Sequence, residues 1–123
     1  MGKKALTMNE RRGDVGVVRF LTSQVLDEMN VQQLGEELRQ LVDKQYLVKI
    51  VINFERVKFL SSAVLGKLIS LHKRLAKEKG RLALCCINKD VRQVFKITRL
   101  DKLIPIFDTE DAALSKIERP RWP

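Results

Sequence analysis

Residues 47–79 read LVKIVINFERVKFLSSAVLGKLISLHKRLAKEK, and this stretch decides the fold. Its first part, residues 47–52, is apolar and β-branched apart from one lysine, so we predict a buried strand. The polar segment 53–58 ends that strand. Two serines, Ser61 and Ser62, then stand where the next element must begin. The stretch therefore predicts a strand, a loop and a helix with two hydroxyl groups at its start.

We predict that an amphipathic helix begins directly after the two serines. Its apolar positions recur at helical spacing and are Val64, Leu65, Leu68, Ile69, Leu71 and Leu75. A serine at a strand-to-helix junction is typical of an N-cap, because its hydroxyl accepts a hydrogen bond from a free backbone N–H. The N–H groups and the helix dipole also favour negative charge there. Ser61 and Ser62 are therefore candidate phosphate-bearing positions, although a serine that only caps is the more common case.

The residues before this stretch predict a hairpin and one helix. Residues 5–11 and 15–21 read as two strands joined by a turn that contains Gly13. Residues 22–28 form a connection in which Asp27 can cap a helix over 29–43. The buried face of that helix is predicted to be Val31, Leu34, Leu38, Leu41 and Val42.

The residues after residue 79 continue the alternation of strands and helices. Gly80 stands at the expected C′ position of the long helix and a buried strand follows over 81–87. Asn88 is predicted to cap a helix over 89–98, and residues 100–103 link it to a short strand over 104–107. The inward face of the helix is predicted to be Val91, Val94, Phe95 and Ile97.

A last helix is predicted to begin after Asp108 or Thr109 and to end near Ile117. The predicted fold is α/β, with a mostly parallel four- to five-stranded sheet, an opening hairpin and about four covering helices. At 123 residues the chain reads as one domain over 1–123, with a core over about 5–117 and a tail over 118–123.

The chain carries a net charge of +9, and the excess lies in its second half. Residues 1–60 hold 10 Lys and Arg against 8 Asp and Glu, whereas residues 61–123 hold 14 against 7. Aromatic residues do not alternate with these cations, so we expect an acidic protein partner rather than nucleic acid. Four cations share the long helix and form either a solvated face or a surface for such a partner: Lys67, Lys73, Arg74 and Lys77.

Nothing in the sequence predicts an enzyme, a cofactor or a metal centre. His72 is the only histidine and stands without Cys, Asp or Glu at ligand spacing. Cys85 and Cys86 are neighbours in a predicted strand, so they are poorly placed to form a disulfide. No apolar run is long enough to span a membrane, and we expect a cytoplasmic protein. Trp122 is predicted to fold back on the domain or to lie at a contact in a homodimer.

The order of elements and several strings resemble the STAS domain family, the anti-sigma factor antagonists, over residues 15–117. In that family a strand ends in Asp-Leu-Ser or a similar string, and Asp-Ser-Ser-Gly-Leu-Gly opens the next helix. The corresponding strings here are Asn-Phe-Glu at 53–55 and Leu-Ser-Ser-Ala-Val-Leu-Gly at 60–66. The string LDKLIPIFDTEDA at 100–112 is similar to a family ending, and Leu-Asp at 26–27 matches as well.

The resemblance implies a regulator of transcription that binds an anti-sigma factor with serine kinase activity. Phosphorylation of one serine by that kinase would end the binding, and a phosphatase would restore it. The matching residue is Ser61, with Ser62 as second choice. The family's Asp before the serines is Leu60 here, and its Gly after them is Ala63. Its Asp at the end of the strand is Asn53. These replacements favour an alternative, in which the domain is a subunit of a constitutive assembly, such as a lipid transporter or a multi-protein sensor, without phosphorylation.

The partner-binding surface is expected to be the loop before the serines and the first turns of the helix. The residues of this expected surface are Arg56, Val57, Lys58, Phe59, Leu60, Ser61, Ser62, Ala63, Val64 and Lys67.

Overall fold

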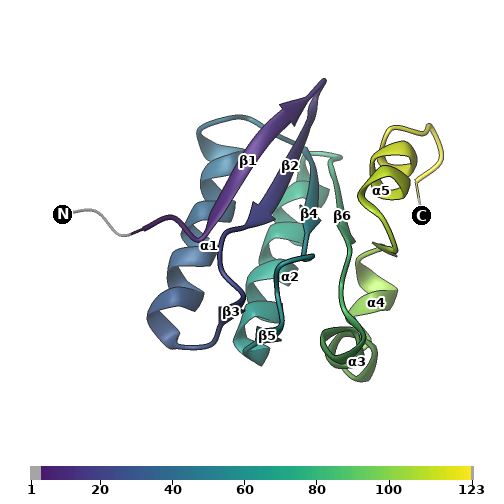
Figure 1. Cartoon of the computed structure of the whole chain (residues 1–123). Helices are drawn as coiled ribbons and strands as arrows, with labels where there is room; N and C mark the ends of the chain where they lie inside the picture. The colour runs from purple at the N-terminus through teal and green to yellow at the C-terminus, as the bar shows by residue number, and fades with distance from the viewer. Residues whose placement is uncertain (1–3, 123) are drawn as a thin grey trace.

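The predicted alternation of strands and helices is present in the computed structural model, which describes residues 4–122 (Figure 1). Residues 1–3 and Pro123 of the predicted domain 1–123 lie outside the described residues. The elements follow one another in this order: β1 (Thr7–Arg12), β2 (Val15–Phe20), β3 (Gln24–Val25), α1 (Glu28–Asp43), β4 (Lys49–Asn53), β5 (Phe59–Leu60), α2 (Ser62–Lys77), β6 (Arg81–Cys85), α3 (Lys89–Ile97), α4 (Leu100–Leu103), β7 (Ile106–Phe107) and α5 (Glu110–Ile117).

A five-stranded sheet in the order β1-β2-β4-β6-β7 forms the centre of the fold. β1 and β2 are antiparallel and form the opening hairpin, whereas the other pairs in this sheet are parallel. The register places Val51 of β4 between Val17 of β2 and Ala83 of β6. This confirms the predicted α/β fold class. The described residues form five helices rather than about four, because residues 100–103, predicted to be a link, form the short helix α4.

The two faces of the sheet are covered by different helices. α1 and α2 lie side by side on one face (Figure 1), where α3 also packs, and this face holds the main core with Ile50 and Ile52 of β4. α5 covers the other face, where Ala113 and Ile117 pack against Val51. All five residues predicted for the buried face of α1 are buried. The carboxyl ends of the parallel strands lie at the edge of the sheet where α1 and α2 begin.

Strand β4 begins at Lys49, two residues later than predicted, because its pairing with β2 and β6 begins there. Leu47 is nevertheless buried, and its side chain fills the space beside Gly16. A Cβ atom on Gly16 would lie 2.5 Å from Leu47 Cδ1, so any larger residue at this position in β2 would require the Leu47 side chain to move. Strand β6 ends at Cys85 instead of residue 87, since Cys86 adopts a left-handed backbone conformation with φ of 61°.

The predicted helix caps agree with the structure. The side chains of Asp27 and Asn88 each accept a hydrogen bond of 2.8 Å from the backbone N–H three residues later. Of the two candidates before α5, Thr109 is the cap, and its Oγ1 accepts from Ala112 N at 3.1 Å. These short-range bonds depend on local sequence alone, which is why the pattern predicts them.

The prediction that Gly80 supplies the left-handed residue after α2 is wrong. Lys79 adopts that conformation, with φ of 56°, and Gly80 N–H donates to Leu75 O at 2.7 Å in a Schellman arrangement. Glycine is needed at position 80 for a different reason. A Cβ atom there would lie 2.2 Å from the carbonyl oxygen of Val48, so the backbone leading into β4 leaves room for hydrogen only.

The prediction that Ile97 faces inward is also wrong, because its side chain is 78% exposed. Val91 and Phe95 of α3 are buried and lie one turn apart. Ile97 is six residues after Val91, which rotates its side chain about 240° around the helix and away from the core. The inward face of α3 therefore consists of Val91 and Phe95, with Val94 half-buried at its margin.

Candidate functional site

The backbone before Ser61 forms a second, small sheet that the sequence did not predict. β3 and β5 pair in parallel, with Gln24 opposite Phe59 and Val25 opposite Leu60. Ser61 N–H then donates to Val25 O at 2.9 Å. The expected connection 22–28 therefore contains a strand that holds the residues before α2 in one position.

The loop between β4 and β5 is anchored by buried residues. Phe54 is fully buried, and its ring packs against Phe20 and Phe95 at centroid distances of 5.0 and 6.0 Å. Val57 is buried as well, and its carbonyl oxygen accepts a hydrogen bond of 3.0 Å from the Asn88 side chain. Although segment 53–58 was predicted to be polar, two of its side chains belong to the core. The loop is consequently a fixed platform for the serines that follow it.

Ser61 is the N-cap of α2, as predicted. Its backbone is extended, and its Oγ accepts a hydrogen bond of 3.1 Å from Ala63 N–H. Its side chain is partly exposed, and Ser62 and Ala63 are exposed. The hydroxyl oxygen of Ser61 thus lies at the surface while it is held by the helix backbone.

The first turn of α2 differs in charge from the first turns of the other long helices. α1 carries Glu28 there, α3 carries Asp90, and α5 carries Glu110 and Asp111. The first turn of α2 contains no acidic side chain. The helix dipole concentrates positive potential at the start of each helix. At the start of α2 no acidic side chain compensates this potential, whereas α1, α3 and α5 each carry one or two there.

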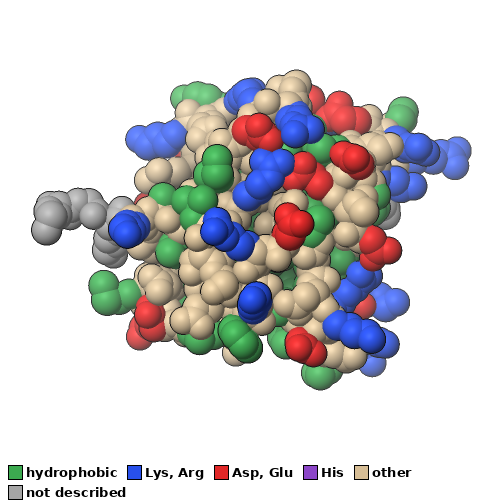
Figure 2. Space-filling model, in the orientation of Figure 1, with side chains coloured by type: hydrophobic (Ala, Val, Ile, Leu, Met, Phe, Trp, Pro, Cys, Tyr) green, Lys and Arg blue, Asp and Glu red, His purple; other side chains and the backbone are tan. Residues whose placement is uncertain are grey.

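Exposed apolar side chains accompany the start of α2. Phe59 of β5 is 60% exposed, and Leu26, which follows β3, is 49% exposed. Met29 in the first turn of α1 is 68% exposed. Figure 2 shows hydrophobic side chains along the lower edge of the molecule, over β3 and β5. A surface that combines exposed aromatic and aliphatic side chains with a rim of hydroxyl groups is typical of protein binding.

The structure narrows the surface expected from the sequence. Its exposed members are Arg56, Lys58, Phe59, Ser62 and Ala63, and its half-buried members are Leu60, Ser61 and Lys67. Val57 and Val64 are buried in the main core, so the expectation that they contact a partner is corrected. Val57 was predicted to contact a partner because it lies in the loop, and Val64 because it lies near the serines. Position along the chain does not show whether a side chain is buried. Leu26 and Met29, which are distant in sequence, were missed.

Asn53, which replaces an acidic residue of the family, has a specific partner. Its side-chain Nδ2 donates to Glu110 Oε1 at 3.0 Å, and its Oδ1 accepts from Glu55 N–H at 2.8 Å. Glu110 also accepts two hydrogen bonds from Arg19, at 2.7 and 2.9 Å. Asn53 is only 7% exposed. An aspartate at this position would place a second carboxylate against Glu110, so the amide is the group that fits.

Arg19 links this network to β1. Its guanidinium donates to Glu10 Oε1 at 2.8 Å. The Arg19 hydrogen bond is the largest cause that lowers the pKa of Glu10, and the Glu10 carboxylate in turn raises the pKa of Arg19. The chain Glu10–Arg19–Glu110–Asn53 therefore connects β1, β2, β4 and the start of α5 through side-chain hydrogen bonds.

The other candidate groups have structural explanations. Cys85 and Cys86 form no disulfide, and burial raises the pKa of the Cys85 thiol, which keeps it protonated and poorly reactive. Within residues 4–122, no group of three or more His, Cys, Asp or Glu side chains is arranged to bind a metal ion. Trp122 folds back on the domain, where its ring lies 5.5 Å from the Arg81 guanidinium carbon. Among the described helices, none is long and apolar enough to cross a membrane.

The model of the STAS domain matches residues 7–113. The chain belongs to the STAS domain family. The match extends from the first strand into α5, so Ser61 lies inside the matched region.

Several members of the STAS family are similar over most of this chain. The anti-sigma F factor antagonist of Paenibacillus polymyxa is 26% identical over 113 residues, which is 92% of this chain and 94% of that protein. BtrV of Bordetella bronchiseptica, whose name places it among anti-sigma factor antagonists, is 33% identical over 72% of this chain and 76% of its own length. The crystal structure of an anti-sigma factor antagonist from Mycobacterium paratuberculosis is 26% identical, with a TM-score of 0.81 over 92% of this chain and 93% of that chain.

Proposed function

We propose that this STAS domain is an anti-sigma factor antagonist that acts in the cytoplasm by binding an anti-sigma factor and not by catalysis. The observation that carries the proposal is the start of α2. There, a partly exposed serine cap follows the exposed Phe59, no acidic side chain stands in the first turn, and Leu26 and Met29 are exposed at the end of β3 and the start of α1. Relatives named anti-sigma factor antagonists match the chain across this region. The partner in this proposal is an anti-sigma factor with serine kinase activity.

The proposed switch is phosphorylation of Ser61, with Ser62 as the second choice. A phosphate adds a charge of about −1.5 to −2 and three acceptor oxygens. Backbone N–H groups at the start of α2 can accommodate that charge, since the first turn holds no acidic side chain. The same charge beside Phe59 would have to lose its water when a partner covers the apolar surface. Phosphorylation would thus be compatible with the folded domain and unfavourable for the complex.

Leu60 and Ala63 support a second candidate function. Leu60 cannot orient a neighbouring hydroxyl as an acidic residue would, and the exposed methyl of Ala63 adds bulk where a kinase loop would approach. In this alternative the domain binds its partners permanently, and Ser61 only caps α2. The two candidates predict different effects of negative charge at position 61.

The test compares wild type, Ser61→Glu and the control Ser115→Glu as bait in native cell lysate, with mass spectrometry of the bound proteins. Ser115 is exposed on α5, far from the start of α2 in sequence and covering the other face of the sheet. We expect a protein kinase on wild type and on the control. Ser61→Glu should lower its affinity by about 1–3 kcal/mol, because a charge enters the contact surface.

The bound kinase is then purified and incubated with ATP and wild type, Ser61→Ala or Ser62→Ala. Incorporation of phosphate into wild type and Ser62→Ala, and not into Ser61→Ala, is the expected result. A kinase that binds all three baits equally would retain the partner but reject Ser61 as the control point. Transporter or sensor subunits on all three baits, without a kinase, would support the constitutive alternative.

A further inference from the structure

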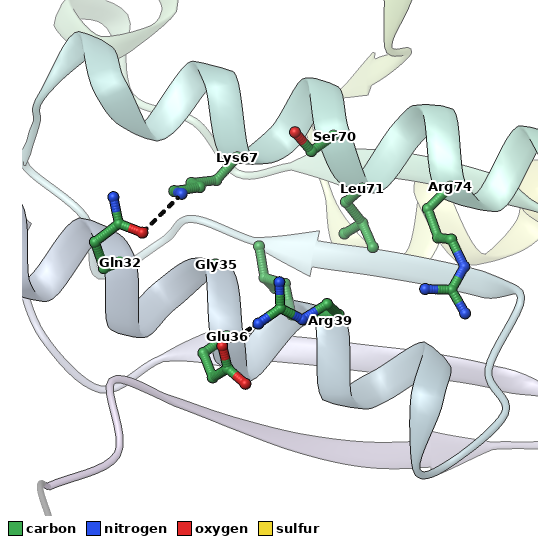
Figure 3. A pocket seen from close by; sticks show the side chains of 9 residues that line it. Gln32, Gly35, Glu36, Arg39, Lys67, Ser70, Leu71 and Arg74 are labelled. Carbon is green, nitrogen blue, oxygen red and sulfur yellow. Dashed lines mark hydrogen bonds and ion pairs between the residues drawn. The ribbon is translucent and has the colours of Figure 1, made fainter.

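Helices α1 and α2 leave a groove of about 310 Å³ between them (Figure 3). Leu38 of α1 and Leu71 of α2 line its apolar part. Lys67 and Arg74 extend from α2 and Arg39 from α1 along its walls. Two of the four cations that the sequence left open, Lys67 and Arg74, therefore line a groove, whereas Lys73 and Lys77 are exposed outside it.

The charges that line the groove are unequal. Three cations and one carboxylate, Glu36, belong to its lining. Lys67 Nζ donates to the neutral oxygen Oε1 of Gln32 at 3.1 Å, and it has no acidic partner among residues 4–122. Arg39 pairs with Glu36, and Arg74 pairs with Asp43 at 2.7 Å. Both of these pairs are partly exposed, so a carboxylate from another molecule can replace the internal partner at little cost.

The backbone of α1 is shaped to keep Lys67 in the groove. The aliphatic part of Lys67 lies across Gly35, where a Cβ atom would be 2.8 Å from Lys67 Cδ and 3.1 Å from its Cε. Any side chain at position 35 would push the lysine away from α1. Lys67 and Arg74 are seven residues apart on α2, which places them about 10 Å apart along the helix axis. An extended chain covers that distance in about three residues.

We propose that this groove binds an acidic segment of a protein partner, with carboxylates at Lys67 and Arg39 and an apolar side chain against Leu71. The groove's own ion pairs show that carboxylates fit its cations, since Glu36 pairs with Arg39 and Asp43 pairs with Arg74. The apolar part between the charged walls favours a peptide over an anion that carries no apolar group. The site goes beyond the proposed function: it shares Lys67 with the surface expected around Ser61, but it involves neither Ser61 nor its phosphorylation.

The test measures binding of a fluorescein-labelled nonapeptide of three Glu-Glu-Leu repeats by fluorescence anisotropy. The variant pair Arg39→Gln/Lys67→Gln removes two cations from the groove, and the control pair Lys73→Gln/Lys77→Gln removes two from the exposed face of α2. We expect the groove pair to bind about tenfold or more weakly than wild type, because charge-assisted hydrogen bonds are lost. The control pair should change affinity less than threefold.

Gly35→Ala provides a second variant that keeps every charge. It should weaken peptide binding because it displaces Lys67, and amide shifts in the NMR spectrum of wild type with peptide should map to α1 and α2. Absence of peptide binding, or equal loss in the two variant pairs, would overturn the proposal. Binding of phosphatidylglycerol vesicles that is lost in the groove pair, without peptide binding, would overturn it in favour of lipid headgroups.

Discussion

The starts of α2 and α5 are both capped by a side-chain hydroxyl, but they differ in the acidic side chains of their first turns. Ser61 and Thr109 each accept a backbone N–H at 3.1 Å through the side-chain hydroxyl. The first turn of α5 carries Glu110, whose carboxylate binds Arg19 and Asn53 and is thereby drawn into the domain. The first turn of α2 carries no acid and opens onto exposed apolar side chains. One helix start is closed by internal contacts, and the other lies beside exposed apolar side chains without an acid of its own.

This difference shows how a small domain divides its charges. Where a helix start holds two elements together, the acidic side chain is supplied by the chain itself and is paired with a cation. Where a helix start is a proposed control point, the negative charge is left out and can be added from outside. The comparison predicts that negative charge is destabilising at the closed start and tolerated at the open one.

The largest expected effect is at the closed start. Asn53→Asp places a carboxylate 3.0 Å from Glu110 in a position that is 7% exposed, so we expect a loss of about 1–3 kcal/mol in the free energy of unfolding at pH 7. The penalty is a repulsion between two ionised carboxylates, so it requires both to be deprotonated. The penalty should therefore be largest at neutral pH and become smaller as the pH falls and the carboxylates are protonated.

Urea unfolding of wild type, Asn53→Asp and Asn53→Asp/Glu110→Gln measures this effect. The double variant should recover most of the lost stability, because an amide at position 110 can donate to the new carboxylate. If the double variant were as unstable as Asn53→Asp, the loss would come from another contact of Asn53, and the pairing with Glu110 would not be its cause.

A smaller effect is expected when aspartate is placed at each cap. Ser61→Asp should raise the free energy of unfolding by about 0.3–1 kcal/mol, because it adds the first negative charge to the start of α2. Thr109→Asp should give no gain, since Glu110 and Asp111 already follow it. Thermal unfolding of the two variants checks the difference. A gain at Thr109 equal to that at Ser61 would show that the existing acids of α5 are irrelevant.

The smallest effect is a change in one titration without a large change in stability. Arg19 lowers the pKa of Glu10, so the contribution of this pair is present above the unfolded pKa of Glu10 and is lost as the pH falls through the folded pKa. In Arg19→Gln the pKa of Glu10 should rise toward its ordinary value. NMR titration of the Glu10 carboxyl carbon in both proteins measures the shift, and an unchanged pKa would contradict the assigned cause.

Much of the fold could be predicted because its determinants are local. The caps Asp27, Ser61 and Asn88 act on N–H groups two or three residues away, and the buried face of α1 follows from helical spacing. The same reasoning was wrong for Ile97. This residue is apolar like its neighbours, but the helical rotation from Val91 places its side chain on the outer face of α3. The same reasoning also assigned Gly80 a conformation that Lys79 adopts.

The site could be predicted only in outline. The serines and the loop before them were located from the sequence, and the family resemblance is the reason that they are proposed as a site. Burial separated Val57 and Val64 from the surface, and the pairing of β3 with β5 brought Leu26 into the vicinity of Phe59. Those assignments depend on which segments become neighbours, and periodicity within one segment holds no such information.

The sequence by itself determined the alternating elements, the opening hairpin, the helix caps and the position of Ser61 at a helix start, since each depends on residues close together in the chain. The tertiary structure alone decided that Asn53 meets Glu110, 57 residues away, and that Arg19 meets it across 91. It also decided that Lys67 lies across Gly35 in a groove. These contacts arise because parallel crossovers bring distant segments to one edge of the sheet or side by side on one face.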